Sequence, residues 1–317
     1  MSQPGLRASS ANSAGSASSA GSVSSAGSVS SAGSVSSAGS VRLLARRAGR
    51  YTAAHPGVAL SVLALLVVLG WMLVPGWFSH QSPNTGDQAS RLQAPSGAHL
   101  FGTDQLGRDM YARVVHGASL SLRTALGATG VALGAGVLLG LLAGYLGRWV
   151  DTVIMRVVDV TLSIPPVLLS LLIISALGFG AVKVAIAVAL TSVASFARLT
   201  RAEVLRVRTA PFVEAAALCG ARWWRILTRY VAPASVGPVL ALAALDFGLV
   251  VLAVSSLSFL GYGPPPPAPE WGALVAGGRN YLATAWWLTA MPGLTVAVVV
   301  LAANRLSRVR ESDRGRS

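Results

Sequence analysis

Charged residues are scarce in this chain of 317 residues: they make up 11% of it, against about 25% in an ordinary soluble domain. Hydrophobic residues make up 53%, and the mean hydropathy is +0.62. Cys219 is the only cysteine, so neither an intrachain disulfide nor a cysteine-based metal site can form. These shortages exclude a soluble or disulfide-stapled domain and indicate an all-α polytopic membrane protein.

Motifs for catalysis and nucleotide binding are also lacking. No GxxxxGK[ST] run occurs, so any ATP must be bound by another chain. The run GASLS at 117–121 ends in Ser and is not a GxSxG nucleophile elbow. The net charge of +14 comes almost wholly from arginines beside apolar runs, without a basic groove lined by aromatics. We therefore expect neither an enzyme nor a nucleic-acid-binding protein.

The N-terminal region has two parts that cannot bury a core. Residues 1–41 are rich in Ser, Ala and Gly, and the unit SSAGSV occurs four times from Ser18 to Val41. This composition predicts a disordered tail, regulatory or dispensable, and it is not that of a secretory signal peptide. Residues 42–55 form a basic flank with four arginines.

Apolar runs predict six membrane-spanning helices, each about 20 residues long. The first covers residues 56–78. Residues 79–123 form an external loop with an amphipathic lead-in, and residues 306–317 form a basic tail. The core at 124–305 holds the other five spans, at about 124–146, 152–177, 182–199, 234–260 and 283–303. Pro165-Pro166 predicts a kink or break in the third span.

Arginines gather in three segments: the 42–55 flank, the stretch 198–233 and the C-terminal tail. An even number of spans places all three on one side of the membrane. Lysine and arginine mark cytoplasmic segments. The chain is therefore predicted to lie in the cytoplasmic membrane, in contact with lipid, with both termini in the cytoplasm.

The stretch 198–233 is polar and holds seven arginines between two apolar runs. Pro211 suits the first turn of a helix, and Glu214 suits the positive end of its dipole. The alanines after Glu214 favour helix, and Gly220 can end it. A second, amphipathic helix at 222–231 is predicted to stop at Pro233. These residues alone leave two interpretations, docking of a partner protein or anchoring at the membrane surface.

The spacing within this stretch resembles the EAA loop of permease subunits of bacterial ABC importers. In that family a short helix inserts into a cleft on the ATP-binding subunit and couples hydrolysis to movement of the spans. The resemblance assigns this coupling role to Pro211, Glu214, Ala215, Ala216, Gly220 and Pro233. Tyr230 and Ala232 stand where the family usually has Ile and Leu.

Further segments resemble the C-type permease of dipeptide and oligopeptide importers, over about residues 42–305. They include GTDQLGRD at 102–109, RWVDTVIMRVVDVTLSIP at 148–165 and LSFLGYGPPPP from Leu257. Val254 and Ser255 replace the usual Glu-Ala pair. The resemblance implies a type I ABC importer permease fold that binds no cofactor itself. It also implies a second homologous permease subunit, two ATPase subunits that use ATP and Mg²⁺, and an extracytoplasmic solute-binding protein.

Three alternatives stay open at this stage. The same architecture could import nickel or another small solute. A stand-alone secondary transporter would need a set of intramembrane charges, and the spans offer only Asp159 and Asp246, each suited either to the transport pathway or to an interhelical hydrogen bond. A metal site is the third alternative. Its candidate ligands are four residues predicted to be external, and their irregular spacing favours a structural turn instead: His99, Asp104, Asp109 and His116.

Overall fold

The computed structural model describes residues 56–314, so the predicted tail at 1–41 and flank at 42–55 lie outside the described residues. The described part is helical, with one isolated β-bridge between Thr103 and Asp109. Its α-helices are α2 (Pro56–Leu73), α3 (Pro75–Phe78), α4 (Met110–Leu146), α5 (Arg148–Ser163), α6 (Pro166–Leu177), α7 (Ala181–Arg208), α8 (Pro211–Leu218), α9 (Trp223–Ile226), α10 (Ala232–Phe259), α11 (Trp271–Gly278) and α12 (Trp287–Arg314). The all-α prediction is confirmed for this part of the chain.

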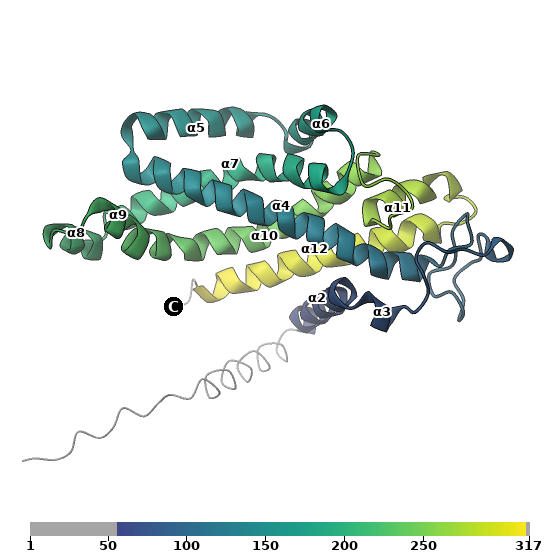
Figure 1. Ribbon diagram of the computed structural model, residues 1–317. Helices are drawn as coiled ribbons and strands as arrows, with labels where there is room; N and C mark the ends of the chain where they lie inside the picture. Colours follow the sequence, from purple (N-terminus) through teal and green to yellow (C-terminus); the bar gives the residue numbers. More distant parts are fainter. Residues whose placement is uncertain (1–55, 315–317) are drawn as a thin grey trace, which may run out of the picture. The chain divides into compact units, whose positions relative to one another are not determined.

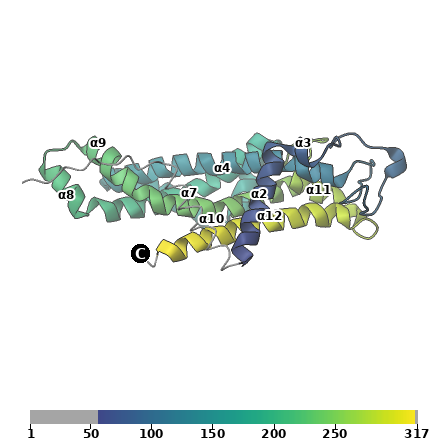
Figure 2. The ribbon, with the colours of Figure 1, turned by 90° about the horizontal axis from the view of Figure 1, so that it is seen from below.

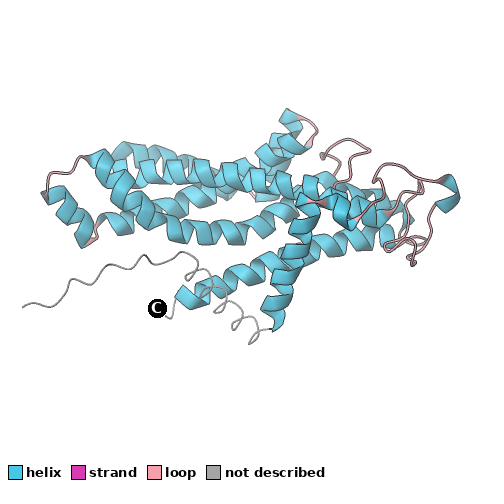
Figure 3. Cartoon of the chain, turned by 60° about the horizontal axis from the view of Figure 1, so that its bottom comes forward, coloured by secondary structure: helices cyan, strands magenta, loops and turns pink. Residues whose placement is uncertain are grey.

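The long helices α4, α7, α10 and α12 run side by side, as Figures 1 and 2 show. Helices α8 and α9 lie at one end of this bundle, and α11 and the 79–109 loop lie at the other. Figure 3 shows α2 crossing the bundle obliquely, in contact with α12 and α4. The segments predicted to be cytoplasmic and those predicted to be external therefore separate to opposite ends.

Four described segments are long and apolar enough to cross a membrane. They are α4 with 37 residues, α7 with 28, the continuous helix Trp223–Phe259 with 37, and Trp287–Ser307 of α12 with 21. Helices α5 and α6 together would make a fifth, and α2 is a shorter apolar helix. The predicted total of six spans stays a prediction.

The second span begins fourteen residues earlier than the predicted position 124, because Asp109 caps α4. The Asp109 carboxylate accepts a hydrogen bond from the N–H of Ala112 at 2.7 Å, which satisfies a free donor of the first turn. Ala112, Val114 and Ala118 are fully buried. The predicted lead-in within 79–123 is therefore partly a loop and partly the first turns of α4.

The third span is broken at the proline pair. A break was one of the two outcomes predicted there, and a kink was the other. Helix α5 ends at Ser163 and α6 begins at Pro166, with an angle of 100° between them. Ile164 and Pro165 have extended backbone, the conformation that a following proline favours. Helix α5, the first half of the span predicted at 152–177, is amphipathic, whereas α6 is apolar all round.

The fourth span continues to Arg208, so the expected polar loop from residue 198 is wrong for its first eleven residues. Favourable helix formers and buried Val204 and Val207 extend it. Arg201 pairs with Asp151 of α5, with Nη2 at 2.6 Å from Oδ2. Part of the predicted loop is thus the end of a packed helix.

Pro233 does not stop a helix, contrary to prediction. The residues from Trp223 to Phe259 form one helix, with a π-helical turn at Leu227–Val231 just before the proline. The N–H of Ala232 bonds the Leu227 carbonyl, five residues back. A π turn re-registers the backbone, so the missing N–H of Pro233 is accommodated.

The ends of other elements also differ from expectation. The predicted loop at 261–281 contains α11, and α12 runs from Trp287 to Arg314 instead of ending near residue 303. The first residues of the predicted tail at 306–317 are therefore helical.

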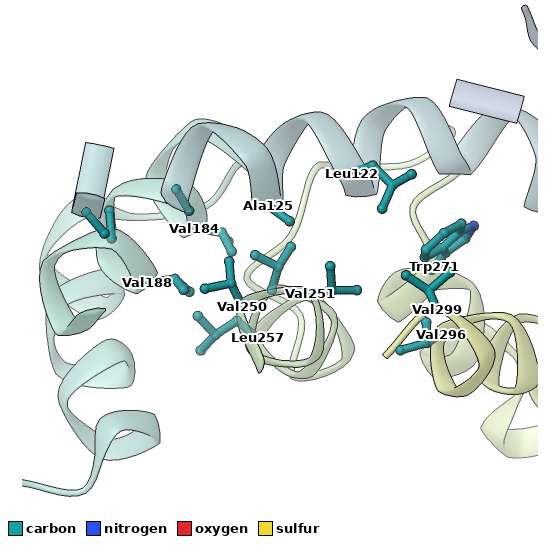
Figure 4. Close-up of a cluster of buried hydrophobic side chains, with 14 of the residues drawn as sticks. Leu122, Ala125, Val184, Val188, Val250, Val251, Leu257, Trp271, Val296 and Val299 are labelled. Atoms are coloured by element: carbon teal, nitrogen blue, oxygen red, sulfur yellow. The ribbon is translucent and has the colours of Figure 1, made fainter. Parts of the chain in front are cut away.

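The main hydrophobic core lies between α4, α7, α10, α11 and α12. Figure 4 shows Leu122, Val184, Val250, Trp271 and Val299 converging from these helices. Further along the bundle the interface of α4 with α7 is made by small residues, because Gly136, Gly140 and Gly144 lie against α7. A Cβ atom at Gly140 would lie 2.5 Å from Cβ of Thr200 and 2.6 Å from the Ala197 carbonyl oxygen.

Candidate coupling helix and intramembrane carboxylates

Helix α8 has start and stop signals that agree with its sequence. Pro211 is its first residue, where no N–H is needed, and Glu214 lies in the first turn. Gly220 has φ +78°. Its N–H bonds the Ala217 carbonyl at 3.0 Å, and the N–H of Ala221 bonds the Ala216 carbonyl at 3.1 Å. This pair of bonds is the Schellman motif, so the predicted short helix and glycine stop are confirmed.

One face of α8 is buried and the other is bare. Val213 packs into a small cluster with Val204 and Val207 of α7, Ile226 and Val231. The opposite residues, which we call the α8 tip, are exposed: Phe212, Glu214, Ala215, Leu218 and Cys219. The side chain of Leu218 is 90% exposed. Together with Phe212, which is 49% exposed, it gives this end of the bundle an exposed apolar surface that a partner could cover.

The α8 tip is joined stiffly to the bundle. Two residues, Thr209 and Ala210, connect it to α7. The Tyr145 hydroxyl of α4 donates a hydrogen bond to the Trp223 carbonyl of α9 at 3.0 Å. Gly136, Gly140 and Gly144 of α4 pack closely against α7, and we call this interface the glycine seam. Because of this close packing, a displacement of α8 would move α7 and α4 together.

The six residues predicted to couple do not all lie on α8. Pro211, Glu214 and Ala215 are exposed there, Ala216 is half-buried, and Gly220 follows at the turn. Pro233 lies at the start of α10, beyond the π turn. Tyr230 and Ala232, which depart from the family pattern, are half-buried, and Tyr230 packs on the Val213 cluster.

The two aspartates that the sequence could not distinguish have different surroundings. Asp159 is on α5 and forms an ion pair with Arg198 of α7; their side chains are 60% and 55% exposed. Asp246 is half-buried near the middle of α10 and receives a hydrogen bond from Ser192 of α7. Its Oδ2 atom is buried with no hydrogen-bond partner among the described residues. The interhelical interpretation suits Asp159, whereas Asp246 keeps an unused acceptor.

The His and Asp residues of the cluster predicted to be external serve the 79–109 loop and the start of α4. Asp104 Oδ2 accepts a hydrogen bond from Arg108 Nε at 2.7 Å, and its other oxygen accepts backbone N–H groups of Leu106 and Arg108. Asp109 caps α4 and lies 2.8 Å from His99 Nδ1. Within residues 56–314 no three His, Cys, Asp or Glu side chains are grouped as metal ligands.

Glu270, a buried acid at the end of the bundle opposite α8, was not predicted from the sequence. It caps α11 by accepting the Ala273 N–H at 2.9 Å, and it accepts a hydrogen bond from Ser121 of α4 at 3.0 Å. Burial raises the pKa of Glu270, and these hydrogen bonds partly oppose that rise. The next residue, Trp271, donates from Nε1 to the Val114 carbonyl at 2.9 Å. The only feature of the sequence that could have indicated this cap is an acidic residue directly before a short apolar run.

The fold and the α8 tip together define a polytopic membrane protein with one end built for contact. Comparison with known proteins identifies its family. Residues 136–313 match the family described as the binding-protein-dependent transport system inner membrane component, and the chain belongs to this family.

Relatives resemble most of the chain. A protein named as a peptide transport system permease in Brucella abortus biovar 1 (strain 9-941) is 39% identical over 264 residues, which cover 83% of this chain and 88% of that protein. The di/tripeptide transport system permease DppC of Pseudomonas aeruginosa (strain UCBPP-PA14) is 37% identical, covering 80% and 85%. A crystal structure of an amino acid ABC transporter shares the fold, with TM-score 0.50, 16% identity and coverage of 63% and 94%.

Proposed function

We propose that this chain is one permease subunit of an ATP-driven peptide importer. A second, homologous permease subunit completes the pathway, and an extracytoplasmic binding protein delivers the substrate. Two separate ATPase subunits use ATP and Mg²⁺. The names of the relatives, which include peptide and di/tripeptide permeases, support the peptide class of substrate.

The α8 tip carries this proposal. Helix α8 begins at Pro211 and ends at the Gly220 turn, its tip is exposed, and two residues join it to a helix of 28 residues. Closure of the ATPase pair would displace α8, and α7 and α4 would follow as one body because of their glycine seam. The permease then switches between outward-open and inward-open states, a two-state change that the ATPase biases.

The arginines support the orientation of this proposal. Arg208 is the last residue of α7 and Arg225 lies on α9, which is beside α8. Helix α12 ends on the same side of the bundle as α8 (Figure 1). Arg305 of α12 lies over Gly57, so the start of α2 is near the same end. By the positive-inside rule, these arginines support a cytoplasmic location for this end and for both termini.

Cys219 offers a direct test because it is the only cysteine and it is exposed at the end of α8. A thiol-directed crosslinker applied to membrane vesicles with the cytoplasmic face outward should join this chain to the ATPase subunit. The matched control is Cys219→Ser with Ser82→Cys, which moves the thiol to the exposed loop at the opposite end. No ATPase adduct from Cys219, or labelling of Cys219 in intact cells by an impermeant maleimide, would overturn the docking assignment.

A further inference from the structure

A cavity of about 390 Å³ lies between α6, α7 and α10. Its size is within the usual range for small-molecule sites. Most of its wall is apolar, and α6 reaches it because the chain turns by 100° after α5. Five hydroxyl side chains interrupt the apolar wall: Ser170, Thr191, Ser192, Ser195 and Ser256.

Among residues 56–314, Asp246 is the only ionisable residue that lines this cavity. Ser192 supplies a hydrogen bond to its carboxyl group, but Oδ2 is buried without a partner among the described residues. The described lining residues include no arginine, lysine or histidine, so they supply no counter-charge to this carboxyl group. A carboxylate removed from water without a cation is costly, and intramembrane acids that persist mark ligand or ion pathways.

We propose that the Asp246 cavity binds a primary ammonium group, namely the N-terminal –NH₃⁺ of a peptide in transit. This proposal rests on the function proposed above. An ammonium group has three donors and a unit charge, which suit the free Oδ2 and neighbouring hydroxyl oxygens such as Thr191 and Ser195. The apolar wall would contact the peptide's side chains.

The composition of the wall disfavours a divalent metal as occupant. Nickel and zinc sites draw on imidazole or thiolate ligands, and calcium needs six or more oxygens, several of them carboxylate. The cavity offers one carboxylate and hydroxyl groups, which are weak metal ligands. An organic ammonium uses the same oxygens through hydrogen bonds and requires no fixed coordination geometry.

The test uses the complete transporter, with its partner permease, ATPases and binding protein, reconstituted in liposomes. Initial uptake of dialanine is compared with uptake of N-acetyl-dialanine, each at saturating loaded binding protein. Asp246→Asn keeps the size of the side chain and removes its charge. It should slow dialanine uptake at least about tenfold, the effect of losing one charge-assisted hydrogen bond. Uptake of the acetylated peptide should be unchanged or faster.

Two further variants separate charge from structure. Asp246→Glu keeps the charge and should restore part of the preference for dialanine. Asp159→Asn removes the other aspartate that the sequence offered as a pathway residue, which is already paired with Arg198, and should leave the preference intact. Equal loss of both peptides in Asp246→Asn, or no change in either, would overturn the ammonium site while leaving peptide import standing. If the unmodified complex imports neither peptide, the proposed function itself fails.

Discussion

The α8 tip and the Asp246 cavity differ from their surroundings in opposite ways. At the tip, the apolar side chains of Phe212 and Leu218 are exposed outside the packed bundle. In the cavity, the half-buried carboxylate of Asp246 has a buried oxygen, and the described lining residues include no cation. Each mismatch is unfavourable in the isolated chain, and each is relieved by a partner of a different kind. A protein surface suits the tip, and a small cation suits the cavity.

Reversing the charge at the tip should have the largest effect on transport. Glu214→Arg replaces the only acid of α8 and disfavours the helix start. Peptide uptake should fall at least about tenfold, because a misplaced charge in an interface costs several kcal/mol. Glu214→Gln, which removes the charge without reversing it, should have a smaller effect. Wild-type uptake by Glu214→Arg, in a normally inserted complex, would refute the coupling role.

Helix α7 contributes to both regions, and its packing against α4 at the glycine seam can be tested by matched glycine substitutions on α4. Gly140→Ala adds a methyl group against Thr200 and the Ala197 carbonyl, and overpacking of this kind costs about 1–3 kcal/mol. Gly134→Ala adds the same group where nothing lies within 4 Å, and it should stabilise the helix by up to about 1 kcal/mol. Thermal unfolding of the purified chain in detergent measures both. Equal responses would show that the seam is not tightly packed.

Substitutions of Asp159 and of Asp246 should differ in their effect on stability. Asp159→Asn breaks an ion pair whose partners are more than half exposed, so it should cost less than about 1 kcal/mol. Asp246→Asn removes an unpaired enclosed charge, so the unliganded protein should be equally or more stable. Sites retained for function at the expense of stability behave in this way. A loss of stability in Asp246→Asn as large as that of Gly140→Ala would instead assign Asp246 a structural role.

The smallest expected effect is that of Glu270, at the end of the bundle opposite α8, on the pH dependence of thermal stability. Burial raises the pKa of Glu270 in the folded protein above its unfolded value. The protonated acid is therefore favoured by folding: the stabilisation is fully present below the unfolded pKa and is lost as pH rises through the folded pKa. Thermal midpoints measured across this range should fall more steeply for the wild type than for Glu270→Gln. Parallel profiles would show that Glu270 does not contribute to the pH dependence.

Local signals predicted α8 almost to the residue. Pro211, the alanines and Gly220 act over one or two helical turns, so their effect is present in the sequence itself. The same kind of signal misled at Pro233, because a π turn five residues long accommodates the proline within one continuous helix. Helix α7 is also longer than predicted, because burial of Val204 and Val207 stabilises helical turns whose polar sequence suggested a loop.

Other features depend on groups far apart in the chain. Asp159 meets Arg198 across 39 residues, and Glu270 meets Ser121 across 149. Of the glycines on α4, Gly136, Gly140 and Gly144 meet α7, whereas Gly127, Gly130 and Gly134 have open space beside them. The first set has the regular i, i+4, i+8 spacing that lines one helix face, but the sequence does not say which helix that face meets.

The sequence by itself determined the membrane class, the approximate positions of the apolar helices, the short helix at 211–218 and the likeness to importer permeases. Hydrophobicity, helix propensity and capping are short-range properties, and they are written in neighbouring residues. Only the tertiary structure decided that Asp159 is paired and Asp246 is not, and that the α8 tip is rigidly joined to α7 and α4. Those outcomes depend on which helices pack together and on which side chains that packing leaves without a partner.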